Sequence, residues 1–469
     1  MKIFLLNPPS PKNTEYVRVD RCMQKKSAWA SSLWQPLSIM YAQAILDKNG
    51  YETILKDATA EQMKYKETLE FILKEKPDIL VLNSAVPTIF NDCQIALDIK
   101  EKLPKIKTVI VGAPTYIIPE IIADYNLDYG IIGDSEYAIL DIVQSNFSKF
   151  VVREIKNTKF IEHFIENLDE IPPPSLKHIH LEKYIMPFTK EKLMLVEPGR
   201  GCPFNCAFCI VPPLAKRRVR YRNPIKFVKE LEKYYKGYKV KNFLFWTETA
   251  TLNKKFMIKI CQEIIRRGLK IKWMTTSRTD TVDEELLTIM KKAGCWLISY
   301  GIESCNQNIL DIIDKGTSVE SAKKAIEIAH RSGIKVMAHV IIGLPKQTKK
   351  SIQETVYWLI KNKVDYAQFY CAVPYKGTKL RAIAEQNNWI ESNDPRKYEI
   401  DNAVMRNEFM STKEIEEMRE WAFSKFYLRP EKILKEIIDN KFNPFYISYF
   451  FKDGFHFFKH WVSIKKSHL

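Results

Sequence analysis

The chain has 469 residues, 46% of them hydrophobic, which is enough for two or three domains with sizeable cores. No apolar run is long enough to span a bilayer, the N-terminal hydrophobic run is too short for a signal peptide, and the nine cysteines are odd in number, so an integral membrane protein and a disulfide-stapled secreted protein are disfavoured. The net charge of +17 suits anionic partners such as lipid headgroups or phosphates, although a lysine-rich composition alone can produce it.

From residue 1 to 143, short apolar runs alternate with amphipathic ones, which predicts a doubly wound α/β unit with a parallel sheet. The expected strands are 2–6, 51–56, 79–83, 108–111 and 129–132, and the expected helices are 38–49, 61–74, 92–103, 119–125 and 136–143. Ligands of such sheets bind beyond the carboxyl ends of the strands. These ends carry mostly small or hydroxylated residues, so a broad, flat ligand can approach. The candidate ligand-binding residues are Pro9, Ser84, Thr88, Gly112, Gly133 and Glu136.

Two absences narrow the identity of that ligand. All eight histidines lie at or after His163, so this unit cannot supply a histidine to a metal. There is no G-x-G-x-x-G motif, which disfavours a dinucleotide. The alternative is a degenerate Rossmann-like unit that binds nothing. Periodicity then weakens between 144 and 191, and the prolines at 172–174 predict a linker.

Three cysteines in one short loop dominate the next segment. Cys202, Cys206 and Cys209 have the spacing C-x3-C-x2-C and follow an expected strand at 193–196. Three thiolates can hold three corners of a 4Fe–4S cluster and leave the fourth iron open. A structural zinc site would need a fourth ligand, and no cysteine or histidine lies in the next fifty or so positions. The pattern therefore favours an iron–sulfur site.

This loop resembles the cluster loop of radical S-adenosylmethionine (SAM) enzymes, including the aromatic Phe208 before the last cysteine. The resemblance implies that the open iron binds the amino and carboxylate groups of SAM. It also implies that one electron from the cluster cleaves SAM to a 5′-deoxyadenosyl radical, so an external electron donor of the ferredoxin or flavodoxin type is expected.

Six strand–helix repeats between 192 and 388 predict a partial parallel barrel, with its active site at the carboxyl ends of the strands. The expected strands are 193–196, 242–246, 272–275, 296–300, 335–341 and 366–370, and the expected helices are 224–235, 254–267, 284–293, 319–332, 350–361 and 378–386. The family resemblance implies SAM-binding residues at Phe208 of the cluster loop and at four of these ends: Thr247, Glu248, Ser277, Arg278, Glu303, Ser304, Ile342 and Gly343.

Two basic regions lie outside these motifs. Lys216 to Arg218, Arg220 and Arg222 follow the cluster loop and could grip a phosphate or acidic headgroup, or could form a solvated charge run. The final segment, 389–469, predicts helices at 412–427 and 431–440. It then interleaves aromatic residues with lysines from 442 to 466, which suits either a membrane interface or a cap packed on the barrel.

The first segment resembles the cobalamin-binding domain that precedes many radical SAM domains, and the chain as a whole resembles the class B radical SAM enzymes. Within that group, the opening residues and the Arg200-Gly-Cys202 loop are most similar to lipid-modifying members, such as hopanoid-tailoring enzymes and archaeal tetraether-ring and calditol synthases. The domains expected are 1–143 for cobalamin, 144–191 as linker, 192–388 as the radical SAM barrel and 389–469 as a helical tail.

The function that this resemblance implies is formation of a C–C bond at an unactivated carbon of a membrane lipid, using a 4Fe–4S cluster, SAM and cobalamin. Such an enzyme would be cytoplasmic, with peripheral contact at the inner membrane face. One alternative is a cobalamin-dependent C-methyltransferase, and another is a non-enzymatic cobalamin or cluster sensor. A nucleic-acid substrate is not expected, because a tRNA methylthiotransferase needs three further cysteines and only Cys22 and Cys93 precede the loop.

Overall fold

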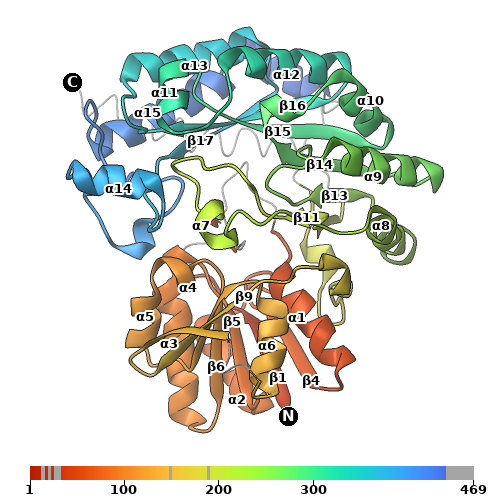
Figure 1. Ribbon diagram of the computed structural model, residues 1–469, viewed down its shortest axis with the longest axis vertical. Coiled ribbons are helices and arrows are strands. Elements are labelled where there is room, and N and C mark those ends of the chain that lie inside the picture. Colours follow the sequence, from red (N-terminus) through yellow and green to blue (C-terminus); the bar gives the residue numbers. More distant parts are fainter. Residues whose placement is uncertain (12–15, 19–22, 26–32, 147–149, 187–190, 440–469) are drawn as a thin grey trace.

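The computed structural model describes residues 1–11, 16–18, 23–25, 33–146, 150–186 and 191–439. Two α/β units stack on one another, with the N-terminal sheet below and a curved sheet above (Figure 1). The loop that carries the three cysteines and helix α7 (Val211–Ala215) lie between them.

The lower unit is a seven-stranded sheet in the order β4-β1-β5-β6-β7-β9-β8. Its five expected strands are present and parallel: β1 (Lys2–Asn7), β4 (Glu52–Asp57), β5 (Ile79–Asn83), β6 (Lys107–Val111) and β7 (Tyr129–Gly133). Alternate residues of β1 serve opposite faces. Ile3 and Leu5 join the core cluster that contains residues of helices α1 (Leu37–Lys48) and α6 (Ser135–Val143). Phe4 and Leu6 join the cluster of α2 (Tyr65–Glu75), α3 (Ile89–Lys102) and α5 (Pro119–Asp124). The doubly wound prediction is confirmed.

The segment expected to be a linker differs from that prediction. Strand β9 (Thr158–His163) pairs in parallel with β7, and β8 (Val151–Ile155) pairs antiparallel with β9, so both extend the lower sheet. Phe160 and Ile161 are fully buried there. Only these two central residues of β9 are strongly apolar, so the strand gives no clear alternating signal in the sequence. The lower unit therefore continues to His163.

The upper unit is a six-stranded parallel sheet in sequential order, as expected for a partial barrel. Its strands are β10 (Leu193–Val196), β13 (Asn242–Phe245), β14 (Lys272–Ser277), β15 (Cys295–Glu303), β16 (Lys335–Ile342) and β17 (Tyr366–Cys371). Its outer helices are α8 (Pro224–Tyr238), α9 (Lys254–Arg266), α10 (Glu284–Lys292), α12 (Val319–Arg331), α13 (Lys349–Lys361) and α14 (Lys379–Gln386). Every expected strand and helix of this unit is present, with shifts only at the ends.

The barrel strands have two distinct faces. On β16, Val336, Ala338 and Val340 are buried in the main core beneath the helices. Met337 and His339 alternate with them and are only half-buried. The same alternation puts Gln368 and Tyr370 of β17 on the inner face, because His339 pairs with Gln368 in the register of the two strands. The barrel lumen is therefore partly open.

The C-terminal helices match the prediction. Helix α15 (Thr412–Tyr427) begins with a capping box in which Ser411 and Glu414 exchange hydrogen bonds, and it packs against β17 and α13. Helix α16 (Pro430–Asp439) follows. The aromatic and lysine-rich segment expected at a membrane or on the barrel lies outside the described residues. Within the described part of the chain, no helix combines the length and apolarity needed to cross a membrane.

Candidate active site

The cluster loop connects the short strand β11 (Gly199–Arg200) to α7. Its centre is anchored on both sides by backbone hydrogen bonds: the Ala207 N–H donates to the Ile313 carbonyl at 2.8 Å, and the Leu380 N–H donates to the Ala207 carbonyl at 2.8 Å. Ala207 is buried in the core that these elements share. The barrel thus fixes the loop independently of any metal.

The three loop cysteines have the properties expected of cluster ligands. All three are free and half-buried. In a cubane, each cysteine binds a different iron, so the thiols need not converge on one ion; accordingly, no group of three described His, Cys, Asp or Glu residues could hold a single metal. Burial raises the pKa of Cys209 to about 12 and also raises that of Cys206, although the charges of Lys315 and Arg278 oppose the rise at Cys206. The residues fit a 4Fe–4S cluster, because its iron would take up these thiolates and the two cations would offset its negative charge.

Two of the residues expected near SAM contact the loop itself. The Gly201 N–H donates to Glu248 Oε2 at 2.9 Å, and Arg278 Nη1 lies 3.9 Å from Cys206 Sγ. The Arg278 guanidinium also stacks on Phe204, with its Cζ 3.6 Å from the ring centroid, and donates to both carboxylate oxygens of Asp280 at 2.9 and 2.8 Å. Arg278 is therefore held beside the cluster loop, and its pairing with a SAM carboxylate remains a prediction.

The other expected SAM residues lie at their strand ends but make internal contacts. Glu303 forms a buried ion pair with Lys315 at 2.7 Å, and Lys315 Nζ lies 5.6 Å from the centroid of the Phe208 ring. Gly343 has φ +92°, and a Cβ there would come within 2.9 Å of Ile415 on α15, so this glycine is required by packing. The remaining four are buried at or just beyond the ends of strands β13 to β16, and their contact with SAM stays a prediction; they are Thr247, Ser277, Ser304 and Ile342.

A buried ion-pair network, which we call the seam, joins the two units. Strand β11 pairs with β12 (Arg220–Tyr221), which sets Arg200 opposite Arg220. Both arginines reach Asp134 at the end of β7: Arg200 Nη1 lies 3.0 Å from Asp134 Oδ1, and Arg220 Nη1 pairs with Oδ2. Arg200 also pairs with Glu136 at 2.5 Å and Glu197 at 2.7 Å. Burial alone would raise the pKa of Asp134, but the charges of the two arginines outweigh it and lower that pKa.

The basic run after the cluster loop has an exposed part, Lys216 to Arg218, and a buried part, Arg220 and Arg222. Besides Arg220, Lys216 pairs with Glu162 of β9, and Arg218 pairs with Glu166 just beyond it. Arg222 is buried and pairs with Glu230 of α8 at 2.6 Å. Three of these four cations therefore bind carboxylates of the lower unit or of the segment that follows it. Lys216 to Arg218 remain a solvated charge run, whereas Arg220 and Arg222 are buried ion-pair partners and do not form an open anion site.

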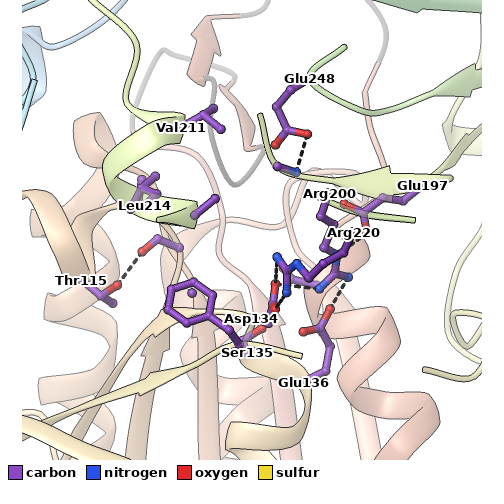
Figure 2. Close-up of a pocket in the computed structure, with 17 residues that line it drawn as sticks. Thr115, Asp134, Ser135, Glu136, Glu197, Arg200, Val211, Leu214, Arg220 and Glu248 are labelled. Atoms are coloured by element: carbon purple, nitrogen blue, oxygen red, sulfur yellow. Dashed lines mark hydrogen bonds and ion pairs between the residues drawn. The ribbon is translucent and has the colours of Figure 1, made fainter. Parts of the chain in front are cut away.

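A cavity of about 100 Å³ lies directly beside the seam. Gly112, Gly133 and Glu136 line it from the strand ends of the lower unit, and Gly201 and Glu248 line it from the cluster-loop side. Figure 2 shows Val211 and Leu214 of α7 across from Arg200 and Arg220, with Glu136 below them. Three of the six predicted ligand residues of the lower unit therefore share one cavity with the cluster loop.

The other three predicted ligand residues lie in a second, closed cluster. Arg18 is fully buried and pairs with Asp92 at 2.9 Å, and its side-chain donors also reach the carbonyl of Pro9 at 3.2 Å. The hydroxyls of Ser84 and Thr88 donate to Asp92 at 2.8 and 2.6 Å. These side chains are already engaged with one another. This half of the strand-end edge is thus filled by the chain's own arginine.

The open half has features that fit cobalamin. Its residues are small, and the buried Glu136 Oε2 has no hydrogen-bond partner among the described residues. Burial raises the pKa of Glu136 although Arg200 opposes the rise. An unpartnered acceptor of this kind suits the peripheral amide N–H groups of a corrin. The cavity of about 100 Å³ holds only part of a cofactor-sized ligand, for which roughly 300–1,000 Å³ is usual.

Comparison with known proteins finds two domain families in the chain. Residues 196–359 match the Radical SAM superfamily, and residues 28–143 match the B12 binding domain. An "uncharacterized methyltransferase" of Pyrococcus horikoshii is 28% identical over 94% of this chain and 95% of its own length. The anaerobic magnesium-protoporphyrin IX monomethyl ester cyclase of Rubrivivax gelatinosus is 28% identical over 81% of this chain and 72% of its own.

Among solved structures, the radical SAM methyltransferase TsrM from Kitasatospora setae superposes with a TM-score of 0.65 at 14% identity, covering 85% of this chain and 82% of that one. This likeness supports the fold. The chain therefore combines a B12-binding domain with a radical SAM domain. It is an enzyme whose cofactors are a 4Fe–4S cluster, SAM and cobalamin, and a radical SAM domain also needs an external electron donor.

Several residues of the site were not expected from the sequence. Arg200 lies beside the cysteine motif, and Asp134 lies between the predicted residues Gly133 and Glu136, but neither was predicted to have a role. Nothing in the sequence around Arg18, Lys315 or Glu197 marks these residues as part of a site. One signal was available: Arg218, Arg220 and Arg222 alternate, so their side chains share one face of an extended segment. The partners of that face could not be named, because Arg220 and Asp134 are 86 positions apart.

Proposed function

We propose that this enzyme is a cobalamin-dependent radical SAM methyltransferase that adds a methyl group to a carbon of its substrate. The observation that carries the proposal is the shared cavity, in which Gly112, Gly133 and Glu136 of the B12-binding domain face Gly201 and Glu248 beside the cluster loop. A methyl group carried at that edge would lie next to the radical-forming centre. The methyltransferase relative that aligns over nearly its full length gives independent support.

When bound, cobalamin supplies a methyl carrier, and the cluster with SAM supplies a one-electron route to a carbon radical. The chain's own residues hold the binding sites of these two centres next to each other. Cys202, Cys206 and Cys209 hold one centre, and the seam ties their loop to the strand ends that receive the other.

Methyl transfer takes the place of the reaction that the resemblance to lipid-modifying enzymes implied. The relatives are a methyltransferase and a cyclase, and they give no support to a lipid substrate. Contact with a membrane surface and a lipid substrate stay predictions, because the segment that suggested them lies beyond residue 439. The sensor alternative is set aside, because the chain is an enzyme.

The test combines a deletion strain with purified enzyme. Anaerobic enzyme reconstituted with iron, sulfide and cobalamin is given SAM, a reductant and the small-molecule extract of the deletion strain. We expect one extract component to gain a methyl group, to gain three deuterons when methyl-deuterated SAM is used, and to be accompanied by both S-adenosylhomocysteine and 5′-deoxyadenosine. Cys206→Ser should yield none of these products.

Two results would reject the proposal. Formation of 5′-deoxyadenosine without S-adenosylhomocysteine would indicate C–C bond formation or cyclisation without methyl transfer. Formation of neither compound would remove the radical SAM methyltransferase assignment altogether.

A further inference from the structure

A chain of neutral hydrogen bonds lies on the inner face of the barrel, away from the seam and the cofactor cavity. Tyr370 donates its hydroxyl proton to Gln368 Oε1. The same hydroxyl oxygen lies 2.7 Å from His339 Nδ1, and the two rings stack with centroids 5.6 Å apart. All three side chains remain half-buried, whereas the residues between them on β16 and β17 are buried against the helices.

The direction of these bonds fixes the tautomer of His339. Because the Tyr370 proton goes to Gln368, the tyrosine oxygen must accept a hydrogen bond from His339 Nδ1–H. Burial, with a further contribution from the charge of Lys315, lowers the pKa of His339 to about 4, so the imidazole is neutral near pH 7. A neutral imidazole carries one proton. Its other nitrogen, Nε2, is therefore a hydrogen-bond acceptor.

This acceptor lies close to the reactive end of the barrel. Gly301 pairs with His339 in the strand register, and a Cβ on Gly301 would come within 2.6 Å of Lys315 Nζ and 2.5 Å of Glu303 Oε1. The Glu303–Lys315 ion pair therefore covers the position next to His339. Lys315 in turn lies over Phe208 of the cluster loop. The Glu303–Lys315 ion pair therefore lies between the cluster loop and His339 on the inner face of the barrel.

We propose that His339 Nε2 accepts a hydrogen bond from an O–H or N–H group of the substrate, with Tyr370 and Gln368 as positioning residues. This inference rests on the proposed methyltransferase for its substrate, and it specifies the substrate class as a molecule that presents a neutral donor beside an apolar body. The neighbouring inner-face side chain of Met337 supplies apolar contact. A group at this point that can only accept hydrogen bonds leaves Nε2 unpaired, which costs affinity.

The test uses two probes of nearly the same shape, phenol and its methyl ether anisole, in sealed equilibrium dialysis against reconstituted holoenzyme. Wild-type protein should bind phenol roughly fivefold to tenfold more tightly than anisole, the factor expected for one hydrogen bond. His339→Phe should bind the two probes equally. His339→Gln, which keeps an acceptor oxygen, should retain part of the preference. His330→Phe, on the outer helix α12, is the matched control and should behave as wild type.

Tyr370→Phe gives an independent readout if the His339 variants fold poorly. It removes the hydrogen-bond acceptor of His339 Nδ1–H, so the imidazole can also adopt the tautomer protonated at Nε2. The ratio of the affinities for phenol and anisole should therefore fall toward one. Equal binding of the two probes by wild type, or a preference that survives in His339→Phe, would overturn the inference. Production of S-adenosylhomocysteine and 5′-deoxyadenosine is measured separately. If those products are absent while the phenol preference follows His339, the proposed function fails and this binding site stands.

Discussion

The seam and the barrel lumen are the two polar regions at the centre of this molecule, and they are built in opposite ways. In the seam, Arg200 and Arg220 are surrounded by carboxylates, and the exposed fractions of the Arg200, Asp134 and Glu136 side chains are 12%, 9% and 2%. In the lumen, His339, Tyr370 and Gln368 are linked by neutral hydrogen bonds and remain half-buried.

This difference indicates that the seam stabilises the contact between the two domains, whereas the lumen is available to bind other molecules. Buried charges are tolerated only when they are paired, so the seam is committed to holding the two domains together. A neutral, half-buried acceptor costs little while unpaired with protein, so the lumen can receive a substrate. Breaking the seam should therefore reduce stability, whereas changing the lumen should alter binding and pH response.

The largest effect should come from Arg200→Met. The substitution leaves Asp134, Glu136 and Glu197 with less compensation in a buried site, which should lower the free energy of unfolding by about 3–5 kcal/mol. Urea unfolding measures this change. The matched control is Arg396→Met, whose exposed pair with Asp394 should leave the unfolding midpoint unchanged. Equal stability of the two variants would mean that the seam does not clamp the domains.

Gly201→Ala should be the next most damaging change. Gly201 has φ +92°, and a Cβ would come within 1.7 Å of the Arg218 carbonyl oxygen, so the cluster loop must shift. We expect a loss of about 2–4 kcal/mol and a fall in iron bound per chain. Gly237→Ala on α8 is the control, because no atom outside its own turns of helix lies within 4 Å of its added Cβ, and it should stabilise the protein by about 0.5–1 kcal/mol. Full iron content in Gly201→Ala would contradict the loop geometry.

The dependence of stability on pH should reveal the contribution of His339 in the lumen. His339 has a folded pKa of about 4, below its ordinary 6.5, so it favours folding above pH 6.5 and loses that contribution as the pH falls toward 4. Between pH 7 and pH 5 the loss should be about 2 kcal/mol in wild type. His339→Gln should lose less over that range when unfolding is followed in urea, and His180→Gln, at an exposed histidine, should match wild type. An identical pH slope in all three proteins would show that His339 is not buried as a neutral group.

The smallest effect should come from the exposed ion pair between Lys216 and Glu162. The Lys216 side chain is 50% exposed where it pairs with Glu162, so Lys216→Ala should cost less than about 1 kcal/mol, and the cost should shrink further in high salt. Urea unfolding at low and high salt tests this. A loss comparable to that of Arg200→Met would mean that the clamp extends to the protein surface.

The sequence predicted repeating elements well because their signals are local. Each barrel strand is a short apolar run between turn residues, and Cys202, Cys206 and Cys209 lie within eight positions of one another. Strand β9 was missed because Lys159 and Glu162 flank only two strongly apolar residues. His339 interrupts a run of otherwise apolar residues in β16 and gives no sign of its partner. The signals that failed are those that depend on contacts between distant parts of the chain.

The same limit explains the lower domain. Pro9 and Ser84 follow strands β1 and β5, and Thr88 directly precedes helix α3, yet all three surround the Arg18–Asp92 ion pair instead of an open cavity. Nothing near Arg18 in the sequence indicates that its guanidinium would be buried against Asp92, 74 positions away. Strand ends can be predicted from periodicity, but which of them remain open depends on tertiary contacts.

The most direct test of the account is a magnetic measurement on the reconstituted protein. With the cluster reduced and the cobalamin in its cob(II)alamin state, pulsed electron paramagnetic resonance should detect dipolar coupling between the two centres, and Cys206→Ser should abolish it. This result is predicted because the cluster loop and the B12-binding strand ends line the same cavity. Bound cob(II)alamin whose signal is unaffected by the cluster would contradict it.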